Sequence, residues 1–373
     1  MSPKISIFIP VYRESIFLEP LLTRLLEDPY KNKEIYVVID EPTEKSVEIS
    51  KKFSEDVNFI FNGERRGKAN VLNEIVKRAS GDIYLFLDAD TLIDGKDGDG
   101  ESFLKTLARE IENADIIEVK KGVLRDSFVA KVASYDYLSF NLINWYFSRK
   151  VGRCLGVNGA AFAIKRETFN ALGGFRRVIC EDLDIATRSF VSGARFKFID
   201  KITVYTKVPS SWKEWFNQRK RWGIGAAFWF KENFKLLKSV LRKYPLVIVP
   251  SLLFIFPALP LLLISLFIPD DLTVKMLYVS LILLSTKMSM LLPPTAITST
   301  TISMLRNFFI VLGSLVFYIS VFYAIARRFQ FCFNPLEFTV FYFIIAPLWL
   351  MIIIASLIKV YTKPEKIRID WKI

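Results

Sequence analysis

The sequence contains no histidine, and its three cysteines, Cys154, Cys180 and Cys332, stand far apart without a CxxC pair. The first absence excludes a histidine triad, a histidine proton shuttle and a histidine-ligated zinc or iron site. The cysteine spacing disfavours a zinc site or a disulfide framework. No glycine-rich P-loop or GxGxxG pattern follows the first predicted strand, which disfavours an NTPase or an NAD enzyme. Proton transfer must therefore use a carboxylate, lysine, tyrosine, cysteine or chain terminus.

Positive charge outweighs negative charge in this chain. Lys and Arg number 51 against 38 Asp and Glu, which gives a formal net charge of +13. The excess gathers between Lys207 and Lys243, where basic residues alternate with Trp and Phe before the apolar last third of the chain. Such a mixture is typical of a helix at a membrane interface. Single-stranded nucleic acid binds similar residues, but the neighbouring apolar spans need a membrane, so we expect membrane lipids and no nucleic acid as partners.

The last third of the chain predicts an all-α transmembrane domain of about four helices. Residues 245–268, 307–326 and 338–358 carry no charge and are long enough to cross a membrane. Residues 272–295 are less regular and are interpreted as a fourth crossing, with a re-entrant or interfacial segment as the alternative. Basic residues before the first span and in the tail 359–373 place both ends in the cytoplasm, which requires an even number of crossings. We therefore expect a multi-pass protein of the cell membrane whose catalytic domain is cytoplasmic.

The first part of the chain alternates short apolar strands with helices. Strands are expected at residues 4–10, 34–40, 57–61 and 82–87, and helices at 19–28, 46–53 and 68–79. This alternation predicts an α/β, Rossmann-like domain with a mostly parallel sheet. Ligands of such sheets bind beyond the carboxyl ends of the strands. Pro10 to Tyr12, Asp40 and the pair Asp88/Asp90 all stand at such ends, so they are candidate binding residues.

Asp88-Ala89-Asp90 follows a wholly apolar strand. Two carboxylates at the ligand edge suit Mg²⁺ or Mn²⁺ held together with a diphosphate, whose charge the metal neutralises. A D-x-D pair alone is a weak signal, and turn or helix-capping acids before Thr91 are the alternative.

Two further motifs lie downstream. Glu181-Asp182 begins a segment with helical spacing, and acids at such a position are often only favourable partners of the helix dipole. The second motif, Gln218 to Trp222, lies inside the basic aromatic segment and is equally compatible with a solvated or lipid-facing helix. Neither motif is decisive alone.

In combination and in this order, these motifs resemble an inverting family-2 glycosyltransferase of the GT-A fold, in the membrane-integrated branch that includes cellulose and hyaluronan synthases. The likeness covers about residues 4–225. It is carried by the following segments: Ile9 to Glu14, Asp40, Gly67 to Asn73, Asp88 to Asp90, Asn158 to Arg166 with Gly173 to Phe175, Glu181-Asp182 with Arg188, and Gln218, Arg221 and Trp222. Cys180 departs from the family, in which Thr is commoner at this position.

The resemblance implies a role for each matched residue. Donor binding falls to Pro10, Tyr12, Glu14, Asp40, Lys68, Asp88, Gln218 and Arg221, with Lys68 near the diphosphate and Arg221 steadying it as it leaves. Asp90, with Asp88, would hold Mg²⁺ or Mn²⁺. Asp182 would be the general base that deprotonates the acceptor hydroxyl, with Glu181 beside it. Trp222, together with Glu181, would contact the acceptor.

The function that follows is transfer of a hexose from a nucleotide-diphosphate sugar, of the GDP-mannose or UDP-glucose type, to a lipid or lipid-linked sugar at the cytoplasmic membrane face. Polysaccharide synthases of this branch have more membrane helices, some before the catalytic domain, so a complete export channel is not expected in a monomer. A short processive synthase is an alternative. A polyprenyl-phosphate (dolichol-phosphate) sugar synthase is another, although that group usually lacks Q-x-x-R-W.

The predicted domain organisation has four parts. Residues 1–206 form the GT-A catalytic domain and 207–244 the amphipathic interfacial helices that carry Gln218 to Trp222. Residues 245–358 form the transmembrane helices, and 359–373 are a basic cytoplasmic tail.

Overall fold

The computed structural model describes residues 2–94, 102–257, 259–261 and 299–367, together with the isolated residues 263, 276, 279 and 280. The chain divides into two units. The first comprises Met1–Leu252 and Met351–Ile373, and the second comprises Leu253–Leu350.

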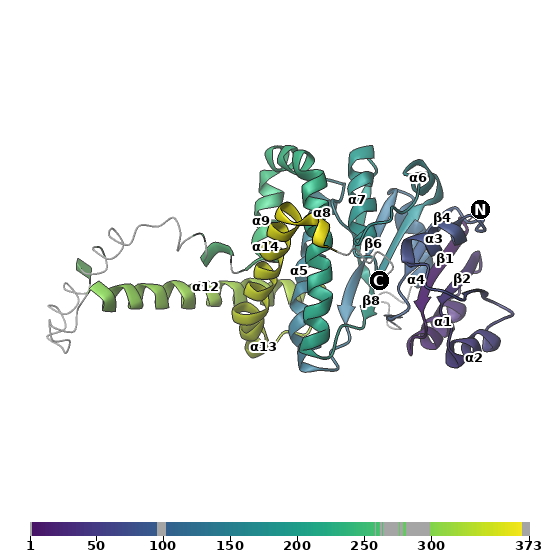
Figure 1. Cartoon of the computed structure of the whole chain (residues 1–373), viewed down its shortest axis with the longest axis horizontal. Coiled ribbons are helices and arrows are strands. Elements are labelled where there is room, and N and C mark those ends of the chain that lie inside the picture. Colours follow the sequence, from purple (N-terminus) through teal and green to yellow (C-terminus); the bar gives the residue numbers. More distant parts are fainter. Residues whose placement is uncertain are drawn as a thin grey trace. The chain divides into compact units, whose positions relative to one another are not determined.

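A single mixed sheet forms the centre of the first unit (Figure 1). Its strands are β1 Ile5–Tyr12, β2 Lys33–Asp40, β3 Asn58–Asn62, β4 Ile83–Leu87, β5 Thr91–Ile93, β6 Ile116–Val123, β7 Ala161–Lys165 and β8 Phe196–Thr206. Within the described residues their order is β3-β2-β1-β4-β7-β6-β8-β5. Strands β1 to β4 are mutually parallel, whereas β7 runs antiparallel to both β4 and β6. The parallel half brings the carboxyl ends of β1, β2 and β4 to one edge of the sheet.

Helices cover both faces of this sheet. They are α1 Leu18–Glu27, α2 Glu44–Lys52, α3 Lys68–Val76, α4 Phe103–Ile111, α5 Phe128–Lys150, α6 Arg166–Ala171 and α7 Glu181–Ser192. Because side chains alternate along a strand, each strand contributes to both layers. The apolar face of α1 and α4 packs with Ile, Val and Leu of the strands in one continuous core. On the other face, the Phe86 ring packs against Phe162 and Phe169 in tilted geometry and against Phe175 edge-to-face.

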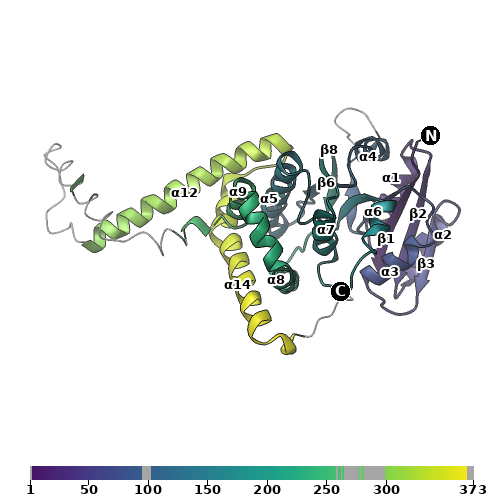
Figure 2. The same cartoon turned by 90° about the horizontal axis from the view of Figure 1, so that it is seen from above.

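The long helix α8 comprises Trp212–Lys243, and helix α14 comprises Ala346–Thr362. Helix α8 runs beside α5 and beside the C-terminal part of α14 (Figure 2). Ser211 caps its first turn by accepting a hydrogen bond from the main-chain nitrogen of Glu214, as Ser127 does for Ala130 in α5. Two glycines of α8 allow close packing. A Cβ at Gly223 would stand 2.8 Å from Oγ of Ser356 in α14, and one at Gly225 would collide with Cys180.

Two apolar helices are long enough to cross a membrane among the described residues, Met304–Phe329 and Pro335–Thr362, with mean hydropathies of 2.3 and 2.5. The first lies in α12, Ser299–Phe329. The second joins α13 Pro335–Val340, a π-helical turn Phe341–Ile345 and α14. They pack through aromatic rings, including Phe322 and Phe338 at 4.7 Å between centroids. A shorter apolar helix, α9, covers Pro245–Ile255, and Pro364–Lys366 forms a last 3₁₀ turn.

The structure bears out the α/β part of the predicted fold. Each strand and helix expected within residues 4–87 is present, with ends shifted by a few residues. The expected spans 307–326 and 338–358 fall within the two long apolar helices. Span 245–268 begins with α9, but its far end and nearly all of span 272–295 lie outside the described residues. A four-helix transmembrane domain therefore stays a prediction.

Candidate active site

Asp40 ends strand β2 and organises the loop that leads to α3. Its buried carboxylate accepts hydrogen bonds from the main-chain nitrogens of Arg66, at 2.8 Å, and Gly67, at 3.0 Å. Asn62 donates a third bond at 2.8 Å. Gly67 has φ of 83°, a conformation that favours glycine, and α3 begins at the next residue. Asp40 thus fixes the position from which Lys68 enters the site.

Tyr12 and Glu14 lie at the same edge of the sheet as Asp40. Tyr12 pairs with Asp40 across β1 and β2, and its hydroxyl donates to Glu41 at 3.1 Å. The Arg65 guanidinium covers the Tyr12 ring at 4.1 Å from the centroid. Glu14 accepts a hydrogen bond from the Thr43 hydroxyl at 2.7 Å, and Pro10 pairs with Val38 within the sheet.

Lys68 joins the two acidic motifs. Its Nζ lies 2.6 Å from Oδ1 of Asp88 and 3.2 Å from Oε1 of Glu181. Burial of the ammonium opposes its charge, but the carboxylates of Asp88 and Glu181 outweigh that effect and raise the pKa of Lys68. The lysine is therefore a fixed cation between the end of β4 and the start of α7.

Asp88 and Asp90 flank a turn whose hydrogen bonds come from the main chain. The Asp88 carbonyl accepts bonds from the nitrogen and the hydroxyl of Thr91, at 3.3 and 2.7 Å. The Asp88 side chain is thus not the capping group of this turn. Crowding by protein atoms, followed by the negative charge of Asp88, raises the pKa of the solvent-accessible Asp90 to about 7.

This pair of carboxylates fits a divalent cation. Their two negative charges, one residue apart along the chain, would stabilise a cation, and their hard oxygens suit Mg²⁺ or Mn²⁺. Among the described residues, no group of three or more Asp, Glu, His or Cys side chains is placed to hold a metal. Further ligands would then have to come from a bound diphosphate or water.

Glu181 and Asp182 open helix α7 and are largely enclosed. Asp182 accepts hydrogen bonds from the main-chain nitrogen of Gly159 at 2.9 Å, on Oδ2, and of Leu183 at 2.7 Å, on Oδ1. Burial raises the pKa of both acids, an effect that the charge of Lys68 opposes. Gly159 leaves no room beside Asp182, since an added Cβ would lie 2.9 Å from its Oδ2.

The Gln218-to-Trp222 motif lies on α8. Arg221 lies near Cys180, the residue before Glu181. Burial raises the pKa of the Cys180 thiol, and the positive charge of Arg221 opposes this rise. Gln218 and Trp222 are half-buried on the same helix. The Trp222 ring stacks on the Arg219 guanidinium at 4.6 Å, and Arg219 pairs with the buried Asp136 of α5 at 2.8 Å. The structure therefore ties Trp222 to α5 through Arg219.

Lys68 brings Asp88 and Glu181 together by direct contacts, and Asp182, the next residue along α7, is near enough for its charge to interact with that of Lys68. Asp90 lies two residues after Asp88. Gly159, Glu118 and Lys121 support this group, and Asp136 and Arg219 hold the Gln218-to-Trp222 motif. None of the five was assigned a role from the sequence, although Gly159 and Arg219 stand inside motifs recognised there. Glu118 and Lys121 stand with Lys120 in a run of mixed charge, which on sequence alone favours an exposed position, and their buried partners depend on the tertiary structure.

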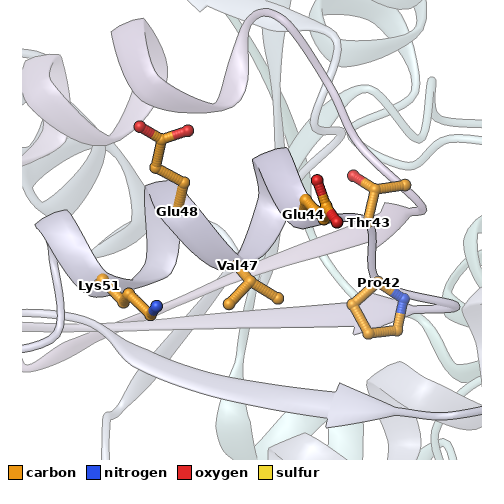
Figure 3. Close-up of a pocket in the computed structure, with 6 residues that line it drawn as sticks. All are labelled: Pro42, Thr43, Glu44, Val47, Glu48 and Lys51. Atoms are coloured by element: carbon orange, nitrogen blue, oxygen red, sulfur yellow. The ribbon is translucent and has the colours of Figure 1, made fainter.

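A surface pocket of about 380 Å³ lies along α2 and is separate from these carboxylates (Figure 3). Its lining residues are Pro42, Thr43, Glu44, Val47, Glu48 and Lys51. None of the predicted catalytic residues lines this pocket, so it is not the candidate active site.

Two protein-family models match the part of the chain that contains these site residues. The family described as "Glycosyl transferase family 2" matches residues 6–113, and "Glycosyl transferase family group 2" matches residues 83–358. The "Probable glycosyltransferase YdaM" of Bacillus subtilis (strain 168) is 25% identical over 237 residues, covering 60% of this chain and 55% of the relative. The "Poly-beta-1,6-N-acetyl-D-glucosamine synthase" of Staphylococcus aureus (strain COL) is 26% identical over 249 residues, covering 65% and 59%.

The chain spans little more than half the length of these curated relatives. Among solved structures, the mannosyltransferase PcManGT from Pyrobaculum calidifontis, in complex with GDP-Man and Mn2+, is 22% identical with a TM-score of 0.49, covering 63% of this chain and 65% of that chain.

Because the second family match spans most of the sequence, this chain belongs to the family-2 glycosyltransferases. The predicted glycosyltransferase family and its transferase class are thus confirmed, whereas the membrane-integrated branch and the hexose specificity stay predictions. The roles of individual residues stay predictions.

Proposed function

We propose that this enzyme transfers a hexose from a nucleotide-diphosphate sugar to a lipid or lipid-linked sugar at the cytoplasmic face of a membrane. The donor would be of the GDP-mannose or UDP-glucose type. The catalytic domain would comprise residues 1–206, and α8 would lie at the membrane surface, followed by transmembrane helices within residues 245–358 and a basic cytoplasmic tail.

One observation carries this proposal. Lys68 bridges Asp88, at the end of a buried strand, and Glu181, at the start of α7, with distances of 2.6 and 3.2 Å. This arrangement places a cation and several carboxylates at the carboxyl edge of a parallel sheet, where α/β proteins bind their ligands. A donor diphosphate, its metal and an acceptor hydroxyl each need one of these groups.

The chemistry is a single displacement. The acceptor oxygen attacks the anomeric carbon, the bond from that carbon to the diphosphate oxygen breaks, and the configuration inverts. Asp182 accepts the proton of the attacking hydroxyl, and the bonds from Gly159 and Leu183 hold its carboxylate in place. Burial raises the pKa of Asp182, which makes its carboxylate a stronger base than that of an ordinary aspartate.

Donor and leaving group are held by charge and hydrogen bonds. Lys68, Gln218 and Arg221 contact the diphosphate as it departs. Asp88 and Asp90 would hold Mg²⁺ or Mn²⁺, which neutralises charge on the diphosphate. Tyr12, Glu14 and Asp40, at the ends of β1 and β2, contact the nucleoside.

The acceptor assignment is supported by the helices that follow the catalytic region. The two long apolar helices suit a membrane, and the basic and aromatic side chains of α8 suit its surface. The C-terminal part of α14 packs directly on α8 at Gly223, so an acceptor held in the membrane surface would lie near the helix that carries Trp222.

The test is a transfer assay on the purified protein in lipid vesicles. Radiolabelled UDP-glucose or GDP-mannose is supplied with Mn²⁺, and label in the organic-extractable fraction is counted. We expect Asp182→Asn to abolish transfer while leaving donor affinity within about threefold, and Asp56→Asn, on an exposed turn, to behave as wild type. Loss of donor binding together with transfer would count against the role of Asp182 as base.

A short processive synthase is the second candidate, favoured by the polysaccharide synthase among the relatives. Product length distinguishes the two functions, since single transfer yields one added sugar. A polyprenyl-phosphate sugar synthase is less well supported, because Gln218, Arg221 and Trp222 match a motif that this group usually lacks.

A further inference from the structure

A tight turn, Asn158 to Ala161, links the two acidic motifs of the site. The nitrogen of Ala161 donates to the carbonyl of Asn158 at 3.4 Å, and the Asn158 side chain accepts from the nitrogen of Ala160 at 3.0 Å. The two inner residues of the turn each hold one catalytic segment. Gly159 donates to the Asp182 carboxylate at 2.9 Å, and the carbonyl of Ala160 accepts from the nitrogen of Asp88 at 3.0 Å.

Beneath this turn lies a buried ion pair. Glu118 and Lys121 of β6 are each 1% exposed, and their charged groups are 3.2 Å apart. Asn144 of α5 donates to the second carboxylate oxygen of Glu118 at 2.7 Å. Asn141 of α5 bonds the main-chain nitrogen and carbonyl of Lys121, at 3.0 and 2.8 Å, so α5 fixes the strand as well as the side chain.

The ion pair interacts with both outer residues of the turn. The Lys121 ammonium donates to the carbonyl of Ala161, and the main-chain N–H of Asn158 is near enough to the Glu118 carboxylate to lower its pKa, although burial raises that pKa overall. The ion pair thus holds the two outer residues of the turn, and the two inner residues hold Asp182 and the main chain of Asp88.

We propose that the Glu118–Lys121 ion pair is a positioning device that holds the Asn158-to-Ala161 turn, and through it Asp182 and the start of the Asp88 motif, in reactive geometry. This inference rests on the proposed function, because the roles of Asp182 and Asp88 belong to it. Neither Glu118 nor Lys121 touches substrate.

The energetics favour a positioning role over a purely stabilising one. Two charges removed from water lose hydration, and apolar residues of similar volume often give equal or greater stability in such places. An apolar pair could fill the same space but could neither donate a hydrogen bond to the carbonyl of Ala161 nor attract the N–H of Asn158. What the ion pair adds is therefore the fixed direction of two main-chain groups, and small displacements of a catalytic group have large effects on rate.

The test combines hydrogen exchange with turnover. The double variant Glu118→Gln/Lys121→Met removes the bond to Ala161 without leaving an unpaired buried carboxylate. The milder variant Asn144→Ala keeps both charges and removes one bond to Glu118, so it serves if the double variant does not fold. The matched control is Asp115→Asn, which breaks bonds to Arg195 and Lys165 just before β6 begins, away from the turn.

Exchange of the Gly159 amide is followed by mass spectrometry in a peptide that covers residues 157–161. Nucleotide release from UDP-glucose and GDP-mannose with Mn²⁺ is measured per donor-binding site, which corrects for unfolded protein. We expect exchange at the turn to become at least tenfold faster in the double variant and turnover to fall at least tenfold, with donor affinity within threefold. Asn144→Ala should show smaller changes of the same sign, and Asp115→Asn should show neither change.

Unchanged exchange at Gly159 would overturn the proposal, and so would faster exchange with unchanged turnover. Failure of wild-type protein to bind either donor would instead contradict the proposed function, and the exchange measurement would still decide whether the ion pair holds the turn.

Discussion

Gly159→Ala should impair catalysis by displacing Asp182. A Cβ at this position would lie 2.9 Å from Oδ2 of Asp182 and 3.2 Å from Nζ of Lys68. The first distance is shorter than an ordinary contact with a methyl group by roughly half an ångström or more, and the second by a few tenths of an ångström. The Asp182 carboxylate must therefore move or rotate. Displacements approaching ~1 Å cost up to ~100-fold in rate, so we expect kcat to fall ~10- to 100-fold, or ~1.4 to 2.8 kcal/mol in activation free energy.

Steady-state kinetics with the donor varied, together with donor binding by calorimetry, would measure this effect. Donor affinity should fall less than kcat, because the closest approach is to the base, at 2.9 Å, and the contact with Lys68, which is assigned to the diphosphate, is longer at 3.2 Å. Gly63→Ala is the matched control, since a Cβ there meets no atom within 4 Å. If Gly159→Ala turned over at the wild-type rate with its fold intact, the placement of Asp182 as the base would be refuted.

Two further predictions concern stability. Asp136→Asn leaves the Arg219 guanidinium, which is 1% exposed, without its carboxylate partner. Breaking a buried pair costs ~3–5 kcal/mol, so the melting temperature should fall by at least ~6 °C, and an unchanged value in a thermal melt would contradict this. Glu34 accepts bonds from Lys4 and Ser6 that outweigh burial and lower its pKa from 4.5 to about 2. This lowered pKa stabilises the fold above pH 4.5, and the stabilisation is lost as the pH falls towards 2. The melting temperatures of Glu34→Gln and wild type should therefore differ at pH 7 and converge near pH 2. A difference in melting temperature that stays constant with pH would argue against this role of Glu34.

Local patterns in the sequence were sufficient for the parallel half of the fold. The apolar runs that become β1, β2 and β4 are buried on both faces, and this produces a strong signal that needs no long-range information. Strands β6 to β8 are harder to predict. The run Ile116–Val123 contains Glu118, Lys120 and Lys121, and charges inside a strand read as exposed until their buried partners are known.

The candidate site was predictable to the extent that its residues form motifs. Asp88, Glu181 and Asp182 lie in short acidic motifs, so their importance could be inferred, but the contact of Lys68 with both acidic motifs could not. The role of Gly159 depends on its main-chain nitrogen, and every residue type except proline has a main-chain N–H, so the residue type alone does not reveal this role. Arg219 stands inside a recognised motif, and only the structure shows that its partner is Asp136, on a different helix.

The proposed function requires Asp88 and Asp90 to bind a nucleotide-diphosphate sugar together with a divalent metal. The most direct test is a thermal-shift titration of the detergent-purified protein with UDP, GDP and their sugar conjugates, each with and without Mn²⁺. A ligand that binds only the folded state raises the apparent stability by mass action. We predict a metal-dependent rise with one nucleotide, abolished by Asp90→Asn and retained by Asp56→Asn. No rise with any nucleotide, or a rise that Asp90→Asn leaves unchanged, would contradict the claim.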